Sequence, residues 1–284
     1  MQKTGRLILV ATPIGNMADL SFRALETLCS VDLIAAEDTR HSGKLLKEYN
    51  IQTKMISLHK FNEAERRQTL LQLLSEGKQI ALISDAGTPG ICDPGADIIR
   101  ACIAEEIDIS IVPGANAAVS ALAVSGLSDK PFTFLGFFPK KSPQAVLDEI
   151  SASIYTTVFY EAPHRIKKTL QLFSASLPSR QLVLVRELTK YYEEVLRGTA
   201  DSLLAHLPAE VKGELVLIVQ GAGEAPPEID REAALSLVNA FLKRGYKHSE
   251  AVRLAAKELG IKKNALYHLT LDQGLSNEEN PVSE

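Results

Sequence analysis

The alternation of short apolar runs with stretches of helical period is the feature that most limits how this chain can fold. Between the runs, the residues repeat at helical spacing: Leu70, Leu71 and Leu74 share one face, and Gly77 is a plausible stop. Apolar strands that alternate with helices predict a mainly parallel sheet covered on both faces. In the first 126 residues the predicted strands are 6–11, 32–37, 54–58, 79–84 and 107–112.

The pattern changes from about residue 131, where a second α/β domain is predicted. Its helices are expected at 142–152, 163–175 and 200–206. The runs 181–187 and 193–199 follow each other without a helix between them, which predicts a hairpin and therefore a mixed sheet. The predicted strands of this domain are 132–138, 156–162, 181–187, 193–199 and 213–221.

A Gly/Pro-rich linker at 221–229 precedes a small helical segment. Three amphipathic patterns at about 231–244, 248–259 and 263–271 predict a helix-turn-helix unit. Residues 230–272 carry eight basic and five acidic side chains, whereas the whole chain has a net charge of −4. We expect domains at 1–126, 127–222 and 230–272, with a boundary in the turn-forming segment 125–131 and a disordered tail at 273–284.

Composition limits the class of protein. A hydrophobic content of 45% is enough for a full core, and the net charge argues against a general polyanion binder. Three scattered cysteines (Cys29, Cys92 and Cys102) predict neither a disulfide framework nor a Cys-rich zinc site, and we expect no metal. We see no signal peptide and no run long enough to span a membrane, so we expect a cytoplasmic protein.

The segments that follow the predicted strands of the first sheet are rich in glycine and polar residues. Ligands of open α/β sheets bind outside the carboxyl ends of the strands, so these segments are candidate site loops. In "SDAGTPGICDPG" (84–95), Gly87 and Gly90 allow a ligand to approach the backbone closely, and Asp93-Pro94 predicts the cap and first residue of a helix. The five segments are 12–16, 38–42, 59–63, 85–95 and 113–118.

Two common nucleotide fingerprints are missing from the sequence. It contains neither G-x-G-x-x-G nor G-x-x-x-x-G-K-[ST], which argues against a conventional dinucleotide dehydrogenase and a P-loop hydrolase.

Eight segments, taken in order along the chain, resemble the tetrapyrrole methylase superfamily. Within it they are most similar to the branch that methylates the 2′-hydroxyl of a cytidine in small-subunit ribosomal RNA. The resemblance implies two α/β domains, S-adenosylmethionine in the cleft between them, a homodimer, and ribosomal RNA or the assembled small subunit as partner. The segments are "ATPIGNMADLSFRALETL", "AAEDTRHSGKLL", "SLHKFNE", "ISDAGTPGICDPG", "VPGANAAVSAL", "FYEAPHR", "RELTKYYEE" and "KGELVLIV".

The resemblance also implies a set of cofactor-binding residues. Ser84 and Ala86 depart from the glycine and proline common in the small-molecule members, so backbone contacts transfer better than side-chain contacts there. Glu161 occupies a place that is often methionine. The implied set is Pro13, Ser84, Asp85, Ala86, Gly87, Ile91, Asn116, Ala117, Glu161, Gly213 and Glu214.

A ribose hydroxyl is a weak nucleophile at neutral pH, so a proton acceptor is expected near it. The candidates at the strand ends are Glu37, Asp38, His59, Glu63 and Glu161. We predict that His59 is the base or a substrate orienter, because histidine side chains in general change charge near neutral pH, and that Glu63 is a second catalytic residue.

Several basic side chains are candidate contacts to RNA phosphates. Phe137 and Phe138 are expected in the core, with stacking on an exposed base as the alternative. Two other functions stay open: a methylase of a tetrapyrrole precursor, and a ligand-sensing regulator that binds nucleic acid. The candidate RNA contacts are Arg40, Lys60, His164, Arg165, Lys247, Lys262 and Lys263.

Overall fold

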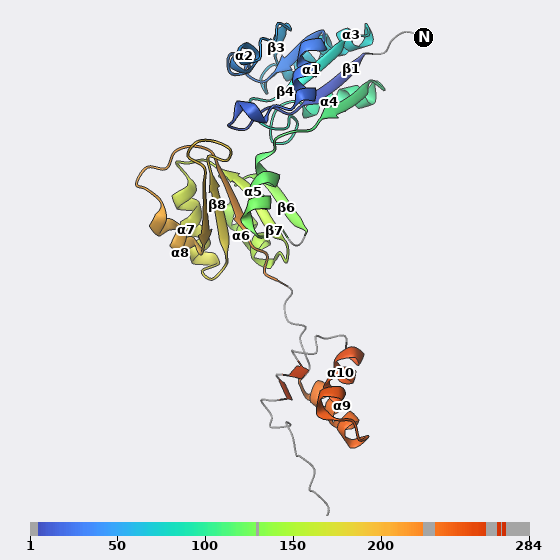
Figure 1. Ribbon diagram of the computed structural model, residues 1–284, viewed down its shortest axis with the longest axis vertical. Helices are drawn as coiled ribbons and strands as arrows, with labels where there is room; N and C mark the ends of the chain where they lie inside the picture. Colours follow the sequence, from blue (N-terminus) through green and yellow to red (C-terminus); the bar gives the residue numbers. More distant parts are fainter. Residues whose placement is uncertain (1–4, 129–130, 224–230, 260–265, 268, 271–284) are drawn as a thin grey trace, which may run out of the picture. The chain divides into compact units, whose positions relative to one another are not determined.

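A computed structural model describes residues 5–128, 131–223, 231–259, 266–267 and 269–270 (Figure 1). Contacts divide the chain into two compact units, Met1–Ala222 and Gly223–Glu284. The greater part of the predicted linker and the predicted tail at 273–284 lie outside the described residues. We describe each unit by itself.

The first sheet is fully parallel and contains the five strands predicted for it. Its order is β3-β2-β4-β1-β5, and all neighbours pair in parallel. The strands are β1 (Arg6–Val10), β2 (Leu33–Ala36), β3 (Met55–Ser57), β4 (Gln79–Ile83) and β5 (Asp108–Val112).

Helices cover both faces of this sheet, as the continuously apolar strands require. Leu28 of α1 and Leu46 of α2 pack with Ile34 and Ile83 on one face. On the other face, helices α3 and α4 pack against residues such as Ile80. A short 3-10 helix, η1 (Met17–Asp19), follows β1. The four helices are α1 (Phe22–Ser30), α2 (Thr39–Glu48), α3 (Glu63–Ser75) and α4 (Ala96–Ala104).

The second sheet is mixed, as the predicted hairpin requires. Its order is β6-β7-β10-β8-β9; β6 and β7 are parallel, and the other pairs are antiparallel. The strands are β6 (Phe132–Phe137), β7 (Thr156–Glu161), β8 (Leu182–Arg186), β9 (Glu194–Gly198) and β10 (Leu215–Val219).

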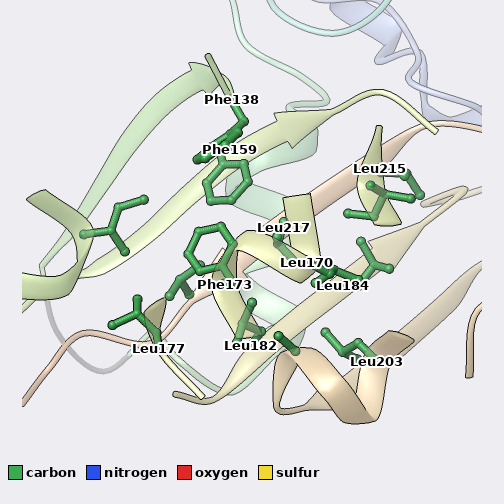
Figure 2. Packing of buried hydrophobic residues seen from close by; sticks show 14 of the residues in the cluster. Phe138, Phe159, Leu170, Phe173, Leu177, Leu182, Leu184, Leu203, Leu215 and Leu217 are labelled. Atoms are coloured by element: carbon green, nitrogen blue, oxygen red, sulfur yellow. The ribbon is translucent and has the colours of Figure 1, made fainter. Parts of the chain in front are cut away.

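One face of the second sheet carries an aromatic core beneath helices α6 (Pro143–Ala152), α7 (Ile166–Ser176) and α8 (Ala200–His206). Figure 2 shows Phe138, Phe159 and Phe173 in this core. Helix α5 (Ala117–Ser125) packs on the opposite face, although it precedes the predicted boundary. The division of the first unit at residue 126 stays a prediction.

The second unit contains α9 (Arg231–Lys243) and α10 (His248–Glu258), close to the first two helices predicted there. Val238, Val252 and Leu266 belong to its own small core. The third predicted helix falls largely on residues outside the described ranges.

We expect Phe173→Ala to lower the free energy of unfolding of the first unit by about 3–5 kcal/mol, because it opens a cavity in the aromatic core. Phe173 is fully buried, and its ring stacks on Phe159 with centroids 5.8 Å apart. Urea unfolding measures the loss. Phe22→Ala is the control, because Phe22 is 90% exposed; a similar loss in both variants would contradict the described core.

Candidate functional site

The larger of two adjoining cavities in the first unit has a volume of about 540 Å³, within the range of small-molecule sites. It receives residues that follow all five strands of the first sheet, among them Ile14, Glu37 and Lys60. The second sheet contributes Tyr160 and the segment 213–216. The cavity therefore lies at the carboxyl ends of the parallel strands.

Nine of the eleven residues predicted to bind a cofactor line this cavity. They are Asp85, Ala86, Gly87, Ile91, Asn116, Ala117, Glu161, Gly213 and Glu214. The other two, Pro13 and Ser84, line the smaller cavity, which has a volume of about 210 Å³. Four residues line both cavities and form what we call the shared wall: Ile14, Asp85, Ala86 and Glu214.

Backbone hydrogen bonds hold the loops of this site together. The N–H of Thr12 donates to the carbonyl of Gly87 over 2.9 Å, and the N–H of Gly87 donates back to Thr12 over 3.0 Å. The Thr12 hydroxyl also donates to the carbonyl of Ser84, and that of Thr88 to the carbonyl of Ala115. The loops after β1, β4 and β5 are therefore fixed to one another.

Glycine is strongly favoured at position 213. Its φ is +92°, and a Cβ there would lie 2.2 Å from Oε1 of Glu187. That carboxylate accepts hydrogen bonds from Lys190 Nζ (2.8 Å) and from the N–H of Glu214 (2.9 Å). The hydrogen bond from Lys190 lowers the pKa of Glu187. Lys190 also pairs with Glu214 of the shared wall, so a single ammonium serves both carboxylates.

Five carboxylates and one lysine line the larger cavity: Glu37, Asp85, Asp93, Glu161, Glu214 and Lys60. Burial raises the pKa of Glu37, and the negative charges of Asp85 and Asp93 add to the effect. Burial also raises the pKa of Asp93, with Asp85 adding to the shift and with Ser84 and Lys60 opposing it. The cavity therefore favours a positively charged ligand.

The second sheet supplies an aromatic side to the same cavity. Burial raises the pKa of Tyr160 to about 12, so its phenol stays protonated at neutral pH. Phe137 packs edge-on against Tyr160, with ring centroids 5.4 Å apart. The prediction of core burial is confirmed for Phe138, which is 2% exposed, and is wrong for Phe137, which lines the cavity and is 60% exposed.

Glu161 is buried and fully engaged by its neighbours. Its carboxylate accepts hydrogen bonds from the N–H of Ala162 and the hydroxyl of Thr169, and it pairs with Arg165. The Arg165 guanidinium also donates to the carbonyls of Phe138 and Pro139. Arg165 therefore holds the loop after β7 from inside, and its predicted contact with RNA would have to compete with these bonds.

Helix α4 begins two residues later than the sequence predicts. Its N-cap is Gly95, and the side chain of Asp93 does not cap it. The acceptor is Glu63 Oε1, which takes hydrogen bonds from the N–H groups of Gly95 and Asp97, both over 3.1 Å. The predicted capping role of Asp93 is wrong, because a carboxylate from α3 occupies the helix end and leaves Asp93 to line the cavity.

The two predicted catalytic residues line neither cavity. Glu63 caps α4 instead. The N–H of His59 donates to Asn62 Oδ1. His59 Nδ1 is buried and has no hydrogen-bond partner within the described residues. Their catalytic roles stay predictions.

The remaining candidate RNA contacts are scattered. Lys60 lines the larger cavity. Arg40 is exposed and pairs with Asp38 over 2.9 Å, which lowers the pKa of Asp38 to about 2. His164 is exposed, and so is Lys247, which directly precedes α10. Lys262 and Lys263 lie outside the described residues.

Sequence reasoning missed part of the site. It treated 38–42 as a loop, but helix α2 begins at Thr39 and brings His41, Ser42 and Lys44 to the smaller cavity. It predicted the strand at 156–162 but gave Tyr160 no role at the site. The available signals were the polar residues of "DTRHS" and the hydroxyl group in "TTVFYE".

The described residues offer neither a cluster of metal-ligating side chains nor a helix that could span a membrane. No group of three or more His, Cys, Asp or Glu side chains among them could hold a metal ion. None of the described helices has both the length and the apolar character that a membrane span needs.

Comparisons with known proteins agree along most of the chain. Residues 6–204 match the family model of Tetrapyrrole (Corrin/Porphyrin) Methylases. Ribosomal RNA small subunit methyltransferase I of Halalkalibacterium halodurans is 43% identical over 272 residues, covering 93% of this chain and 94% of that protein. The protein of the same name from Escherichia coli O157:H7 is 44% identical, covering 95% and 96%.

Solved structures share the fold at lower identity. A diphthine synthase gives a TM-score of 0.60 at 12% identity, covering 76% of this chain and 90% of that chain. The uroporphyrin-III-C-methyltransferase from Thermus thermophilus gives 0.54 at 21% identity, covering 76% and 94%. Both are similar in architecture alone.

We expect Glu63→Ala to lower the free energy of unfolding by about 0.5–2 kcal/mol, because two N–H groups at the start of α4 lose their acceptor. Glu63→Gln keeps an acceptor oxygen and should lose less. Urea unfolding measures both. Glu65→Ala is the control on the same helix, because Glu65 is exposed; equal losses at positions 63 and 65 would contradict the capping role.

Proposed function

Because the chain belongs to the tetrapyrrole methylase family, and within it to that of ribosomal RNA small subunit methyltransferase I, we propose that it methylates the 2′-hydroxyl of a cytidine in small-subunit ribosomal RNA. The methyl donor in this proposal is S-adenosylmethionine. The observation that carries the proposal is the match to relatives of that name along nearly the whole chain.

The larger cavity fits S-adenosylmethionine in size and in chemistry. Its carboxylates suit the positive charges of the sulfonium and ammonium groups. Its apolar side chains, including Ile91, Leu188 and Val216, suit the adenosine part. When bound, this cofactor supplies an electrophilic methyl group; the chain has to position the acceptor and take up its proton.

We assign the role of proton acceptor to Glu37. Its pKa is raised by burial, which brings a carboxylate closer to the range in which a general base is effective. It also accepts a hydrogen bond from the backbone of Asp85, a residue of the shared wall. Asp93 adds negative charge beside it and keeps the pKa of Glu37 high.

The fixed loops contribute by orientation. Holding a nucleophile and a methyl group in near-attack geometry supplies much of the barrier reduction in such a displacement. The bonds between Thr12 and Gly87 and between Thr88 and Ala115 preset the loops without any ligand. Phe137 and Tyr160 cover one side of the cavity and help to exclude water.

The helical second unit, Gly223–Glu284, favours this proposal over the alternatives. A methylase of a small tetrapyrrole precursor needs no such unit, whereas a structured RNA is recognised by shape as well as by one base. We propose that the unit docks RNA, with Lys247 on its described surface and Lys262 and Lys263 beyond it. A ligand-sensing regulator is the weaker alternative, because the family is one of methylases. A homodimer and a cytoplasmic location are further parts of the proposal.

We expect the protein to transfer labelled methyl groups to small ribosomal subunits or to their naked RNA. Digestion and nucleoside analysis should find the label on the 2′-oxygen of cytidine. Incubation without RNA is the control. Label on a base atom, or on a tetrapyrrole precursor alone, would contradict the ribose assignment.

We expect Glu37→Gln to slow single-turnover methyl transfer by roughly 10²–10⁴-fold, because the proton acceptor is lost. Asp93→Asn should lose less activity. It should also move the midpoint of the rate–pH profile to lower pH, because removing a nearby negative charge lowers the pKa of Glu37. The pH profile of both variants tests this.

His59→Ala is the comparison for the base assigned from sequence. A large loss in His59→Ala together with full activity in Glu37→Gln would return the assignment to His59.

A further inference from the structure

Helix α2 presents three polar side chains to the smaller cavity: His41, Ser42 and Lys44. The proposed binding of the cofactor does not explain these three side chains, because none of them lines the larger cavity. The smaller cavity also receives Lys190, but this ammonium is already paired with Glu187 and Glu214. Within the described residues, Lys44 has no ion pair and is exposed. It is therefore a cation available to an anionic ligand.

The hydroxyl of Ser42 lacks a partner where one is expected. Ser42 is 2% exposed, and its Oγ is buried with no hydrogen-bond partner among the described residues. Buried polar atoms are nearly always hydrogen-bonded, and leaving one unpaired costs free energy. Ser42 lines the cavity, so a rotation of its side chain toward the cavity would give the hydroxyl a partner on a bound ligand.

The position of the smaller cavity limits what that ligand can be. It adjoins the larger cavity across the shared wall, so its occupant lies next to the cofactor site. Asp85 of the shared wall accepts a hydrogen bond from the N–H of Asp38, the N-cap of α2, over 3.0 Å. That bond fixes the helix that carries Ser42 and Lys44 against the shared wall.

We propose that the smaller cavity is the subsite for the target nucleotide, with Ser42 Oγ bonded to a polar atom of that nucleotide and Lys44 paired with its phosphate. The inference rests on the proposed function and names where its substrate sits. A volume of about 210 Å³ cannot hold a base pair, so the part of the target that enters the cavity comes from a nucleotide unstacked from its neighbours.

The carboxylates of the shared wall are each engaged by a protein group, but both keep their negative charge, so it is Lys44 that draws a phosphate to this cavity. Glu214 is paired with Lys190, and Asp85 is occupied by the N–H of Asp38. The subsite therefore has one available cation, one unpaired hydroxyl and two carboxylates with partners.

The first test is Ser42→Ala, compared with the wild-type chain in urea unfolding, S-adenosylmethionine binding and methyl transfer to small ribosomal subunits. Removing a hydroxyl without an internal partner should leave the unfolding midpoint equal or higher. The affinity for S-adenosylmethionine should not change. The value of kcat/KM for the RNA should fall roughly 2-fold to 12-fold, as expected for the loss of one hydrogen bond.

The second test is a matched pair on the same helix. Lys44 lines the smaller cavity, whereas Lys47 is exposed and lines neither cavity. Lys44→Ala should weaken RNA binding and reduce the slope of log affinity against log salt concentration by about 1, because one phosphate contact is lost. Lys47→Ala should leave both unchanged.

The outcomes separate this inference from the proposed function. Equal RNA affinity in Lys44→Ala and Lys47→Ala, with full activity in Ser42→Ala, would overturn the subsite while ribose methylation by the wild type stands. A loss of S-adenosylmethionine affinity in Ser42→Ala that matches its loss of activity would assign the cavity to the cofactor instead. A wild-type chain that binds S-adenosylmethionine and methylates no RNA would overturn the proposed function, and this inference with it.

Discussion

The two backbone hydrogen bonds between Thr12 and Gly87 fix the geometry on which the rest of the candidate site depends. Strands β1 and β4 are parallel neighbours, and nothing in a parallel ladder forces the chains that leave them to stay together. The bridge extends their pairing beyond the strand ends. Ile14 on one side and Asp85 and Ala86 on the other are thereby held in the shared wall.

The charge of the larger cavity works against the stability of the fold. Raised pKa values mean that the folded chain holds protons on Glu37 and Asp93 more tightly than the unfolded chain does. Ionisation of these groups therefore opposes folding, and the cost appears as the pH rises through their unfolded pKa values. Such groups are retained at sites where a bound ligand needs them, and other contacts have to offset their cost in folding stability.

Periodicity alone predicted the ten strands found in the described part of the chain, the mixed second sheet and the first two helices of the second unit. Periodicity gave a wrong result where a residue distant in the sequence caps a helix, and where a bulge interrupts a strand. Asp93-Pro94 is locally a good helix start, but Glu63 comes from 30 residues earlier and caps α4 at Gly95. A local pattern cannot show a carboxylate that arrives through the tertiary fold.

The prediction that Phe137 lies in the core was wrong for a different reason. The pairing of β6 with β7 shifts register between Phe134 and Phe137, and Gly136 has a φ of +69°. Such a bulge changes the side of the sheet to which the following side chain points. The prediction that both Phe137 and Phe138 lie in the core is therefore wrong for Phe137. Of the eleven residues that the family resemblance implies, nine line one cavity, and their role in cofactor binding stays a prediction.

Glu187 and Gly213 have a consequence for how this sequence can change over evolutionary time. Any side chain at 213 would meet the Glu187 carboxylate, whereas a side chain at Gly43, on α2, would meet nothing within 4 Å. Drift at position 43 is therefore sterically free. At position 213 any side chain is strained by the φ of +92°, and it would also push the Glu187 carboxylate away from Lys190 and Glu214. A single substitution at 213 therefore disturbs a group of three charged residues.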